Sequence, residues 1–442
     1  MSASLQAGAA TADITPRDSQ FLFGYPHVER WSTGVHRPLF ASALYLNDGV
    51  TPLITVACDV LFVDRELTTR ARARIEQATG VPAVNITVTA THTHSGPLTT
   101  EMLSMSEDPV LPAVDPGYLR VLEDGVVESA IAAVKGAFAA EIGLVVANGS
   151  CVGTNRHDPN GPSDPDVPVL AVRPKGQTEL AAIMLICAMH PTVLHEDSTL
   201  VSSDFPGATR SHLQSLYGDD LPVVYHIGVS GDQSPRHITR ANTIEEADRI
   251  GTLLGKAIEE SLRGLQFADS VSIGCRSRKI DLPARQFPSV EEAEATVQRV
   301  RATWERLRNE GADPRATRTV ECQLFGAEET LTFSRAQASG AVAETIDRLL
   351  PIEITVFQVG GWSFLFWPGE FFVEFGLQVR SQFPNVFIAT MANSDLQGYV
   401  VTAEAVQKET YEALNALFAS PESGHLVVES SVRLLSEFRT QR

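Results

Sequence analysis

The chain has 442 residues, of which 43% are hydrophobic and 20% charged, and this composition is typical of a folded globular protein. The formal net charge of −19 argues against nucleic acid or an anionic membrane as a partner, because both require basic patches. The five scattered cysteines lack CxxC spacing, which favours reduced thiols and a cytoplasmic location. Residues 1–20 lack the features of a signal peptide, and no apolar run reaches transmembrane length. We therefore expect a small-molecule substrate and no membrane partner, and the oligomeric state stays open.

Strand-like and helix-like patterns alternate along the chain. Three pairs of strand-like segments flank short turns and predict β-hairpins, namely residues 43–46 with 52–58, 167–173 with 179–189, and 352–359 with 362–366. Because hairpin strands pair antiparallel, these segments predict a mixed sheet rather than a purely parallel one.

Helical patterns lie between the strands. Thr243 with Glu246, and Ser289 with Glu292, form capping patterns ahead of amphipathic segments. Residues 309–338 are the most polar and irregular part of the chain, and we expect them to form an insertion or lid. No break in composition divides the sequence. The prediction is one α/β domain over residues 1–442, with a mixed β-sheet core flanked by helices.

The most informative segment is residues 91–97, with the sequence THTHSGP. It follows an alternating strand pattern at residues 84–90, so two imidazoles emerge where a strand ends in a turn. Imidazole is a common metal ligand and suits proton transfer near neutral pH. In an extended backbone both rings would reach one site, whereas a bend would separate them into a metal ligand and a proton-handling neighbour. A structural histidine pair remains the alternative.

Several later blocks also place ionisable or hydrogen-bonding side chains at the boundaries of elements. They are residues 189–194 (MHPTVL), 203–207 (SDFPG), 228–235 (GVSGDQSP), 368–371 (PGEF), 392–393 (AN), 398–399 (GY) and 411–412 (YE). Strand ends that face loops are where α/β enzymes usually hold their chemistry.

Taken in order, these blocks resemble the catalytic domain of the neutral/alkaline (non-lysosomal) ceramidases, a family of zinc amidohydrolases. The resemblance begins at residues 8–16 (GAATADITP) and 34–39 (GVHRPL), includes THTHSGP, and ends at residues 393–412. It therefore covers nearly the whole chain, and it implies the fold of the ceramidase catalytic domain.

The resemblance also implies roles for individual residues. The implied zinc ligands are His92, His190, Glu370 and Tyr399. The implied catalytic residues are His94, Arg156 and Tyr411. Two imidazoles and a carboxylate form a known zinc set that leaves room for water, whose pKa zinc lowers to about 7. His94 would then transfer protons, while Arg156 and Tyr411 would donate hydrogen bonds to an oxyanion.

Each of these side chains also has a structural alternative. Without the resemblance, Tyr399 and Tyr411 would be interpreted as packing tyrosines at helix boundaries. Arg156 would be interpreted as a solvated arginine, and Glu370 as a residue in the first turn of a helix. A tyrosine phenol ionises near pH 10, so Tyr399 would bind metal only with a cation nearby to stabilise the phenolate.

Other polar residues in the blocks have weaker assignments. Asp204 fits helix capping better than catalysis. Asp232 and Ser234 lie in a glycine-bounded turn that they could simply shape, although the family places this loop near the substrate. His36 and Asp59 are equally consistent with supporting a metal ligand and with a purely structural role.

The chain also departs from the family. Secreted ceramidases carry a leader and a C-terminal immunoglobulin-like domain, and we expect the catalytic domain alone here. Leu396 replaces a usual tyrosine, and Ala405-Val406 replaces a Glu-Tyr step, so we expect both changes to alter the rim of the substrate site.

The expected function is a cytoplasmic zinc hydrolase that cleaves the amide bond of a soluble N-acyl compound. The alternatives are a zinc esterase, lactonase or sugar-processing hydrolase, and a non-catalytic family member.

Overall fold

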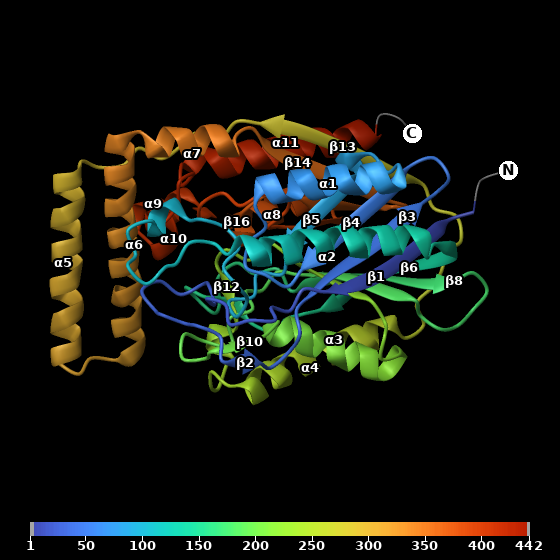
Figure 1. Cartoon of the computed structure of the whole chain (residues 1–442), viewed down its shortest axis with the longest axis horizontal. Helices are drawn as coiled ribbons and strands as arrows, with labels where there is room; N and C mark the ends of the chain where they lie inside the picture. The colour runs from blue at the N-terminus through green and yellow to red at the C-terminus, as the bar shows by residue number, and fades with distance from the viewer. Residues whose placement is uncertain (1–3, 440–442) are drawn as a thin grey trace.

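The computed structural model describes residues 4–439. The first three residues of the segment 1–20, which lacks the features of a signal peptide, lie outside the described residues. Two β-sheets pack face to face and helices cover their outer faces (Figure 1). The strands of the larger sheet are, in spatial order, β11 (Val223–Ile227), β9 (Ala182–Cys187), β8 (Asp166–Pro174), β6 (Phe138–Asn148), β1 (Gln6–Asp13), β3 (Phe40–Asn47), β4 (Pro52–Cys58) and β5 (Ile86–Ala90). The smaller sheet has the order β13 (Ile273–Ile280), β14 (Ile352–Val359), β15 (Trp362–Phe366) and β17 (Val386–Ala389).

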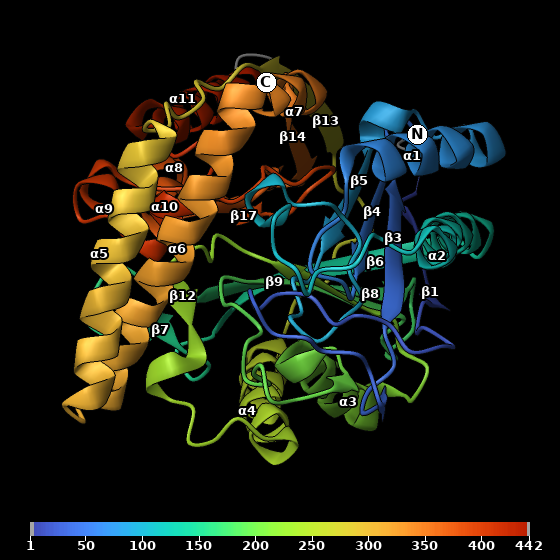
Figure 2. The same cartoon turned by 60° about the vertical axis from the view of Figure 1, so that its left-hand side comes forward.

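Helices form the two outer layers. The outer face of the large sheet is covered by α1 (Arg65–Thr79), α2 (Pro116–Lys135), α3 (Asp204–Tyr217) and α4 (Ile244–Leu262). The small sheet is covered by α7 (Ala341–Leu349), α8 (Val373–Gln382) and α11 (Pro421–Arg439). Figure 2 shows these groups of helices on opposite sides of the sheets. The mixed α/β fold predicted from the sequence is confirmed. No helix among residues 4–439 combines the length and apolarity needed to cross a membrane.

The predicted hairpins and helix starts are present. β3 pairs antiparallel with β4, β8 with β9, and β14 with β15. The side chain of Thr243 accepts a hydrogen bond from the backbone of Glu246 at the start of α4. Ser289 and Glu292 form a reciprocal capping box at the start of α5 (Val290–Asn309). These features are local in sequence, which is why the pattern of residues predicts them.

Residues 309–338, whose sequence pattern is irregular, are mostly helical in the structure. Most of them form the long helix α6 (Pro314–Ser339), which packs along α5 as a helical hairpin at one side of the molecule (Figures 1 and 2). Leu324 and Ala327 of α6 pack against Val297 of α5. The polar composition reflects a helix that buries only a narrow face, and a role of this segment as an insertion or lid stays a prediction.

The two edges of the large sheet approach each other through a buried histidine. His226 on β11 contacts Thr55 on β4 and Thr89 on β5, with nitrogen–oxygen distances of 3.2 and 2.7 Å. Burial lowers the pKa of His226 to about 3, so the ring is neutral at physiological pH. The strand ends that carry the two histidine blocks are thereby brought to the same region.

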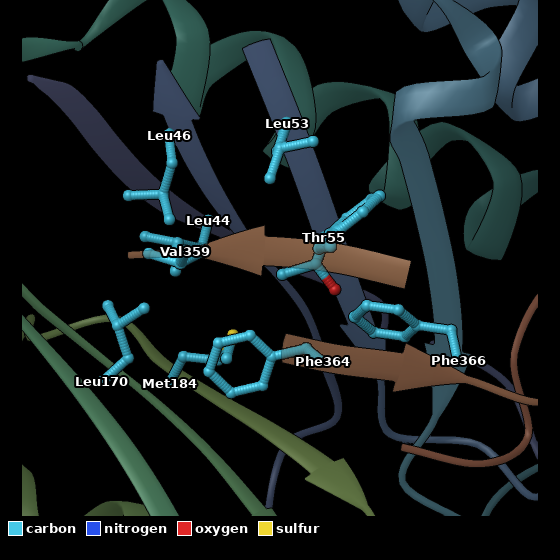
Figure 3. Close-up of a pocket in the computed structure, with 10 residues that line it drawn as sticks. Leu44, Leu46, Leu53, Thr55, Leu170, Met184, Val359, Phe364 and Phe366 are labelled. Carbon is cyan, nitrogen blue, oxygen red and sulfur yellow. The ribbon is translucent and has the colours of Figure 1, made fainter. Parts of the chain in front are cut away.

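A small cavity of about 20 Å³ lies between the two sheets (Figure 3). Its walls are apolar side chains such as Leu53, Met184 and Phe364, together with Thr55. A space of this size with so few polar partners is a packing void rather than a binding site. Its lining includes none of the seven site residues expected from the sequence.

Short elements complete the fold. Parallel two-stranded pairs are β2 (Gly34–Val35) with β10 (Leu200–Val201), and β16 (Glu370–Phe371) with β18 (Tyr399–Val400). β7 (Thr154–Asn155) pairs antiparallel with β12 (Gln233–Ser234). The short helices are α9 (Ala403–Gln407), α10 (Tyr411–Leu414), η1 (Ala83–Asn85), η2 (Leu103–Met105) and η3 (Pro235–His237).

Candidate metal centre and active site

Three nitrogen and oxygen atoms converge at the ends of the strands. The Nε2 atoms of His92 and His190 are 3.1 Å apart, and Glu370 Oε2 lies 3.2 Å from the first and 3.1 Å from the second. His92 follows β5, His190 follows β9, and Glu370 lies in β16. All three side chains are buried. The structure therefore brings together three of the four ligands that the resemblance implies.

The hydrogen bonds of the two imidazoles fix which nitrogen faces the centre. His92 Nδ1 lies 2.9 Å from the carbonyl oxygen of Leu61, and His190 Nδ1 lies 2.7 Å from that of Ser230. Because a carbonyl only accepts, each Nδ1 carries the hydrogen, so that in its neutral form each ring presents an Nε2 lone pair to the centre. Two lone pairs and a carboxylate oxygen repel one another unless a cation lies between them.

A metal ion fits this arrangement. Ligand atoms held at 2.0–2.1 Å in tetrahedral geometry are separated by about 3.3 Å, close to the observed separations. The backbone carbonyls that accept from Nδ1 are the usual partners that orient metal-binding imidazoles. His92, His94 and His190 also form a buried group whose ligand atoms lie within 4.8 Å of one another, and this group could hold a metal ion.

His94 differs from its neighbour in orientation. His92 has a positive φ of 66°, which breaks the alternation of the strand, and the two rings are nearly perpendicular at 88°. His94 Nδ1 lies 3.0 Å from the carbonyl oxygen of Gly24, while its Nε2 is buried and has no hydrogen-bond partner among the described residues. Burial is the main cause that holds the pKa of His94 well below its ordinary value. A neutral imidazole with a free lone pair can accept a proton.

Tyr399 lies beside the three ligand atoms. It is the register partner of Glu370 in the β16–β18 pair, and its ring stacks at 6.5 Å from that of His190. Burial raises the pKa of Tyr399 well above its ordinary value, and Glu370 raises it further against the opposing effect of Arg156. A phenolate would therefore require a cation at the centre.

Arg156 and Tyr411 lie on the other side of Tyr399. The Arg156 guanidinium stands over the Tyr399 ring, 5.3 Å from its centroid, and the rings of Tyr399 and Tyr411 are 6.3 Å apart. Burial raises the pKa of Tyr411 well above its ordinary value, so its hydroxyl remains a hydrogen-bond donor. Arg156 is only 17% exposed at its side chain and pairs with Glu412.

The residues with weaker assignments are structural in this fold. Asp204 accepts hydrogen bonds from the backbone N–H groups of Val193 and Leu194, and so ties the start of α3 to the segment after His190. Asp232 accepts from Asn155 Nδ2 and from the backbone N–H of Val373.

The side-chain partners of His36 and Asp59 lie outside the His92, His190 and Glu370 triangle. His36 Nδ1 contacts Ser202, and Asp59 pairs with Arg210. Leu396, which we expected at the rim, is buried in the core against Gly369. A Cβ added at Gly369 would lie 2.7 Å from the Leu396 side chain. The leucine that replaces the family's usual tyrosine therefore packs beneath the turn that precedes Glu370.

Sequence reasoning missed three side chains that hold the site. Arg30 is buried and donates to the backbone carbonyls of His94 and His195, but no motif marks it. Tyr25 packs 5.3 Å from the His94 ring and bonds the carbonyl of Leu194. Glu412 pairs with Arg156, and its adjacency to Tyr411 was the single sequence signal that could have drawn attention to it.

The comparisons with known proteins concern the family and the fold. Residues 5–221 match the family model described as neutral/alkaline non-lysosomal ceramidase, N-terminal. The crystal structure of neutral ceramidase from Pseudomonas aeruginosa matches with a TM-score of 0.76 at 20% identity, covering 99% of this chain and 75% of that one. A structure described as a ceramidase complexed with C2 matches with the same TM-score at 18% identity, covering 99% of this chain and 76% of that one. No curated protein sequence matches the chain. Residues 5–221 are therefore similar to the N-terminal domain of the neutral/alkaline non-lysosomal ceramidase family, and the chain has the fold of neutral ceramidase over nearly its whole length.

Proposed function

We propose that this chain is a zinc-dependent hydrolase that cleaves the amide bond of a soluble N-acyl compound. The observation that carries the proposal is the triangle formed by His92 Nε2, His190 Nε2 and Glu370 Oε2, with the unpartnered Nε2 of His94 beside it. A bound zinc ion would supply a nucleophilic hydroxide at neutral pH, because it lowers the pKa of a coordinated water to about 7. Tyr399 would be the fourth protein ligand.

The other side chains have separate tasks in this proposal. His94, held by the Gly24 carbonyl, accepts the proton of the attacking water and returns it to the leaving amine. Arg156 and the Tyr411 hydroxyl donate hydrogen bonds to the developing oxyanion, and their burial makes these bonds stronger than they would be in water. The amide class is supported by the ceramidase family and fold, since ceramide is an N-acyl compound.

The polar surroundings of the site support a soluble substrate. Arg318 on α6 pairs with Glu196 at 3.2 Å, and Glu196 also contacts His195. The His195 ring lies 4.8 Å from Tyr25, which packs against His94. Charged side chains linked to the proposed base through His195 and Tyr25 favour a polar group on the substrate over a long alkyl chain.

The test is a substrate panel with the purified zinc form. Short N-acyl amides and amino-sugar amides, their matched esters, and long-chain ceramide are compared at equal concentration, with the His92→Ala/His190→Ala double variant as the control for contaminating activity. We expect turnover of the soluble amides. Ceramide turnover with kcat/KM above about 10⁴ M⁻¹s⁻¹ and no reaction of soluble amides would overturn the soluble substrate. Faster ester cleavage would make the chain an esterase, and no turnover of any compound would favour a binding role.

A further inference from the structure

A part-buried ion pair joins the two segments that carry the proposed oxyanion donors. Arg156 Nε donates to Glu412 Oε1 at 2.7 Å, and the Nη2 atom of the same guanidinium also contacts that oxygen. Arg156 follows β7, whereas Glu412 lies in α10 directly after Tyr411. One carboxylate thus links Arg156 to the short helix that begins with Tyr411.

The environment of Glu412 keeps it ionised. Its side chain is only 2% exposed, and burial alone would raise its pKa. The Arg156 and His157 side chains outweigh that effect and hold the pKa of Glu412 well below its ordinary value. His157 Nε2 lies 3.1 Å from the same Oε1 atom, but its side chain is 42% exposed. Arg156 is the dominant partner because it is the more deeply buried cation.

The guanidinium needs such a partner to hold one position. An arginine side chain has many rotamers, and contact through both Nε and Nη2 fixes the plane of the group. That plane is the one that stands over the Tyr399 ring. A buried guanidinium that lost its carboxylate would be an uncompensated charge and would move toward water.

The helix that carries Glu412 is itself held from α6. Thr330 Oγ1 donates to the carbonyl of Leu414 at 2.6 Å, and a Cβ at Gly326 would lie 2.7 Å from the Leu414 Cβ atom. This close approach leaves α10 little freedom to shift. Glu412 therefore projects toward Arg156 from a fixed support rather than from a mobile loop.

We propose that Glu412 is a positioning residue for the hydrolytic reaction. It holds Arg156 beside Tyr399 and fixes the distance between the Arg156 and Tyr411 donors, so that both meet the substrate carbonyl in preset positions. This inference rests on the proposed hydrolase function, because it assigns Glu412 an effect on the chemical step. It makes no use of Glu412 as a proton donor or acceptor.

The test compares Glu412→Gln and Glu412→Asp with the control His157→Ala, which removes the exposed partner of the same carboxylate. We expect Glu412→Gln to retain zinc and to lower kcat about 10–100-fold with a smaller change in KM, because a displaced donor loses alignment in the transition state. Glu412→Asp keeps the charge and should recover part of the loss. His157→Ala should stay within about threefold of the unchanged protein, as removal of an exposed partner costs little.

Two further measurements separate positioning from general destabilisation. In a double-mutant cycle, Glu412→Gln should add little to the loss caused by Arg156→Lys. In zinc-loaded protein with labelled arginine, the Arg156 Nε–H resonance should be protected from exchange, should lose that protection in Glu412→Gln, and should keep it in His157→Ala.

The possible outcomes distinguish the two proposals. If the unchanged protein hydrolyses none of the N-acyl compounds, the proposed function fails and the inference fails with it. If the unchanged protein is active and Glu412→Gln matches it in kcat, the inference alone is overturned. An increase in KM with unchanged kcat, or additive losses in the cycle, would equally exclude positioning for the chemical step. If Glu412→Gln does not fold, Glu412→Asp and the Arg156 resonance of the unchanged protein decide the question.

Discussion

Glu370 and Tyr399 are register partners in the parallel pair formed by β16 and β18. Side chains at paired positions of neighbouring strands point to the same face, so this pairing presents a carboxylate and a phenol side by side. His190 lies next to both, 3.1 Å from Glu370 Oε2 and stacked against the Tyr399 ring. The short pair therefore supports the proposal that Glu370 and Tyr399 act together as metal ligands.

The metal centre can be tested by removing two of its ligands together. We expect His92→Ala/His190→Ala to lose stoichiometric zinc, because the remaining carboxylate and phenol cannot hold the ion alone. Metal content is measured by mass spectrometry of the purified protein after dialysis. The control is His157→Ala, which lies outside the triangle and should keep its zinc. Full zinc occupancy in the double variant would show that the metal binds elsewhere.

His94 should matter for turnover rather than for metal binding. We expect His94→Ala to retain zinc and to lose about 10²–10⁴-fold in kcat, the usual contribution of a general base. The same dialysis and metal analysis, combined with single-turnover kinetics, checks both parts. This variant is decisive because His94 also belongs to the buried three-histidine group. Zinc loss equal to that in His92→Ala would make His94 a ligand instead.

Gly24 sets the position of the proposed base. Its φ is +124°, and a Cβ added there would lie 2.5 Å from His94 Nδ1, which bonds the Gly24 carbonyl. We expect Gly24→Ala to displace the His94 ring and to lower kcat about 100-fold with zinc retained. Gly176→Ala is the matched control, since its φ is +77° and nothing lies within 4 Å of the added Cβ. Equal activity in the two variants would argue against this role.

Asp204 should make stability depend on pH. Burial raises its pKa from 3.8 to about 6, against the opposing backbone hydrogen bonds from Leu194 and Phe205. The folded state therefore holds a proton that the unfolded state has lost, so this stabilisation is fully present below pH 3.8 and is lost as the pH rises through about 6. Asparagine keeps the shape without the charge.

Denaturant unfolding of the unchanged protein and Asp204→Asn at pH 4 and pH 7, in the same metal state, measures this effect. From pH 4 to pH 7 the free energy of unfolding of the unchanged protein should fall, relative to that of Asp204→Asn, by up to about 3 kcal/mol. This is the change expected for a shift of about two pKa units. A difference that does not change with pH would show that the carboxyl group titrates normally in the folded protein.

Local features could be predicted because neighbouring residues cause them. The turn at Asn47-Asp48-Gly49 closes the β3–β4 hairpin, and Ser289 with Glu292 closes the capping box of α5. The amphipathic pattern gave less information for residues 309–338. There the helix buries a narrow stripe, so the apolar pattern was too weak to predict a helix, and the sequence did not reveal that this helix supports α10.

The roles of side chains were likewise predictable only where they depend on neighbouring residues. The order of the motifs indicated seven site residues, but no property of Leu396 in the sequence showed that it packs beneath the turn before Glu370. Nor did Arg156 carry any sign that its partner would be Glu412, because the two residues lie in distant segments. Such pairings depend on how α10 docks, and docking is decided by packing over the whole chain.

The sequence by itself determined the residue types, since two histidine blocks, a PGE turn and a pair of tyrosines already specify a metal-binding and hydrogen-bonding set. It also determined that the first histidine block stands at a strand end, because the alternating pattern stops where that block begins. Only the tertiary structure decided which atoms meet. His226 draws the strand ends of β5 and β11 together, and the left-handed backbone of His92 turns its ring away from that of His94. Both effects arise from contacts between segments far apart in the chain, where the free energy of packing, and not local preference, sets the geometry.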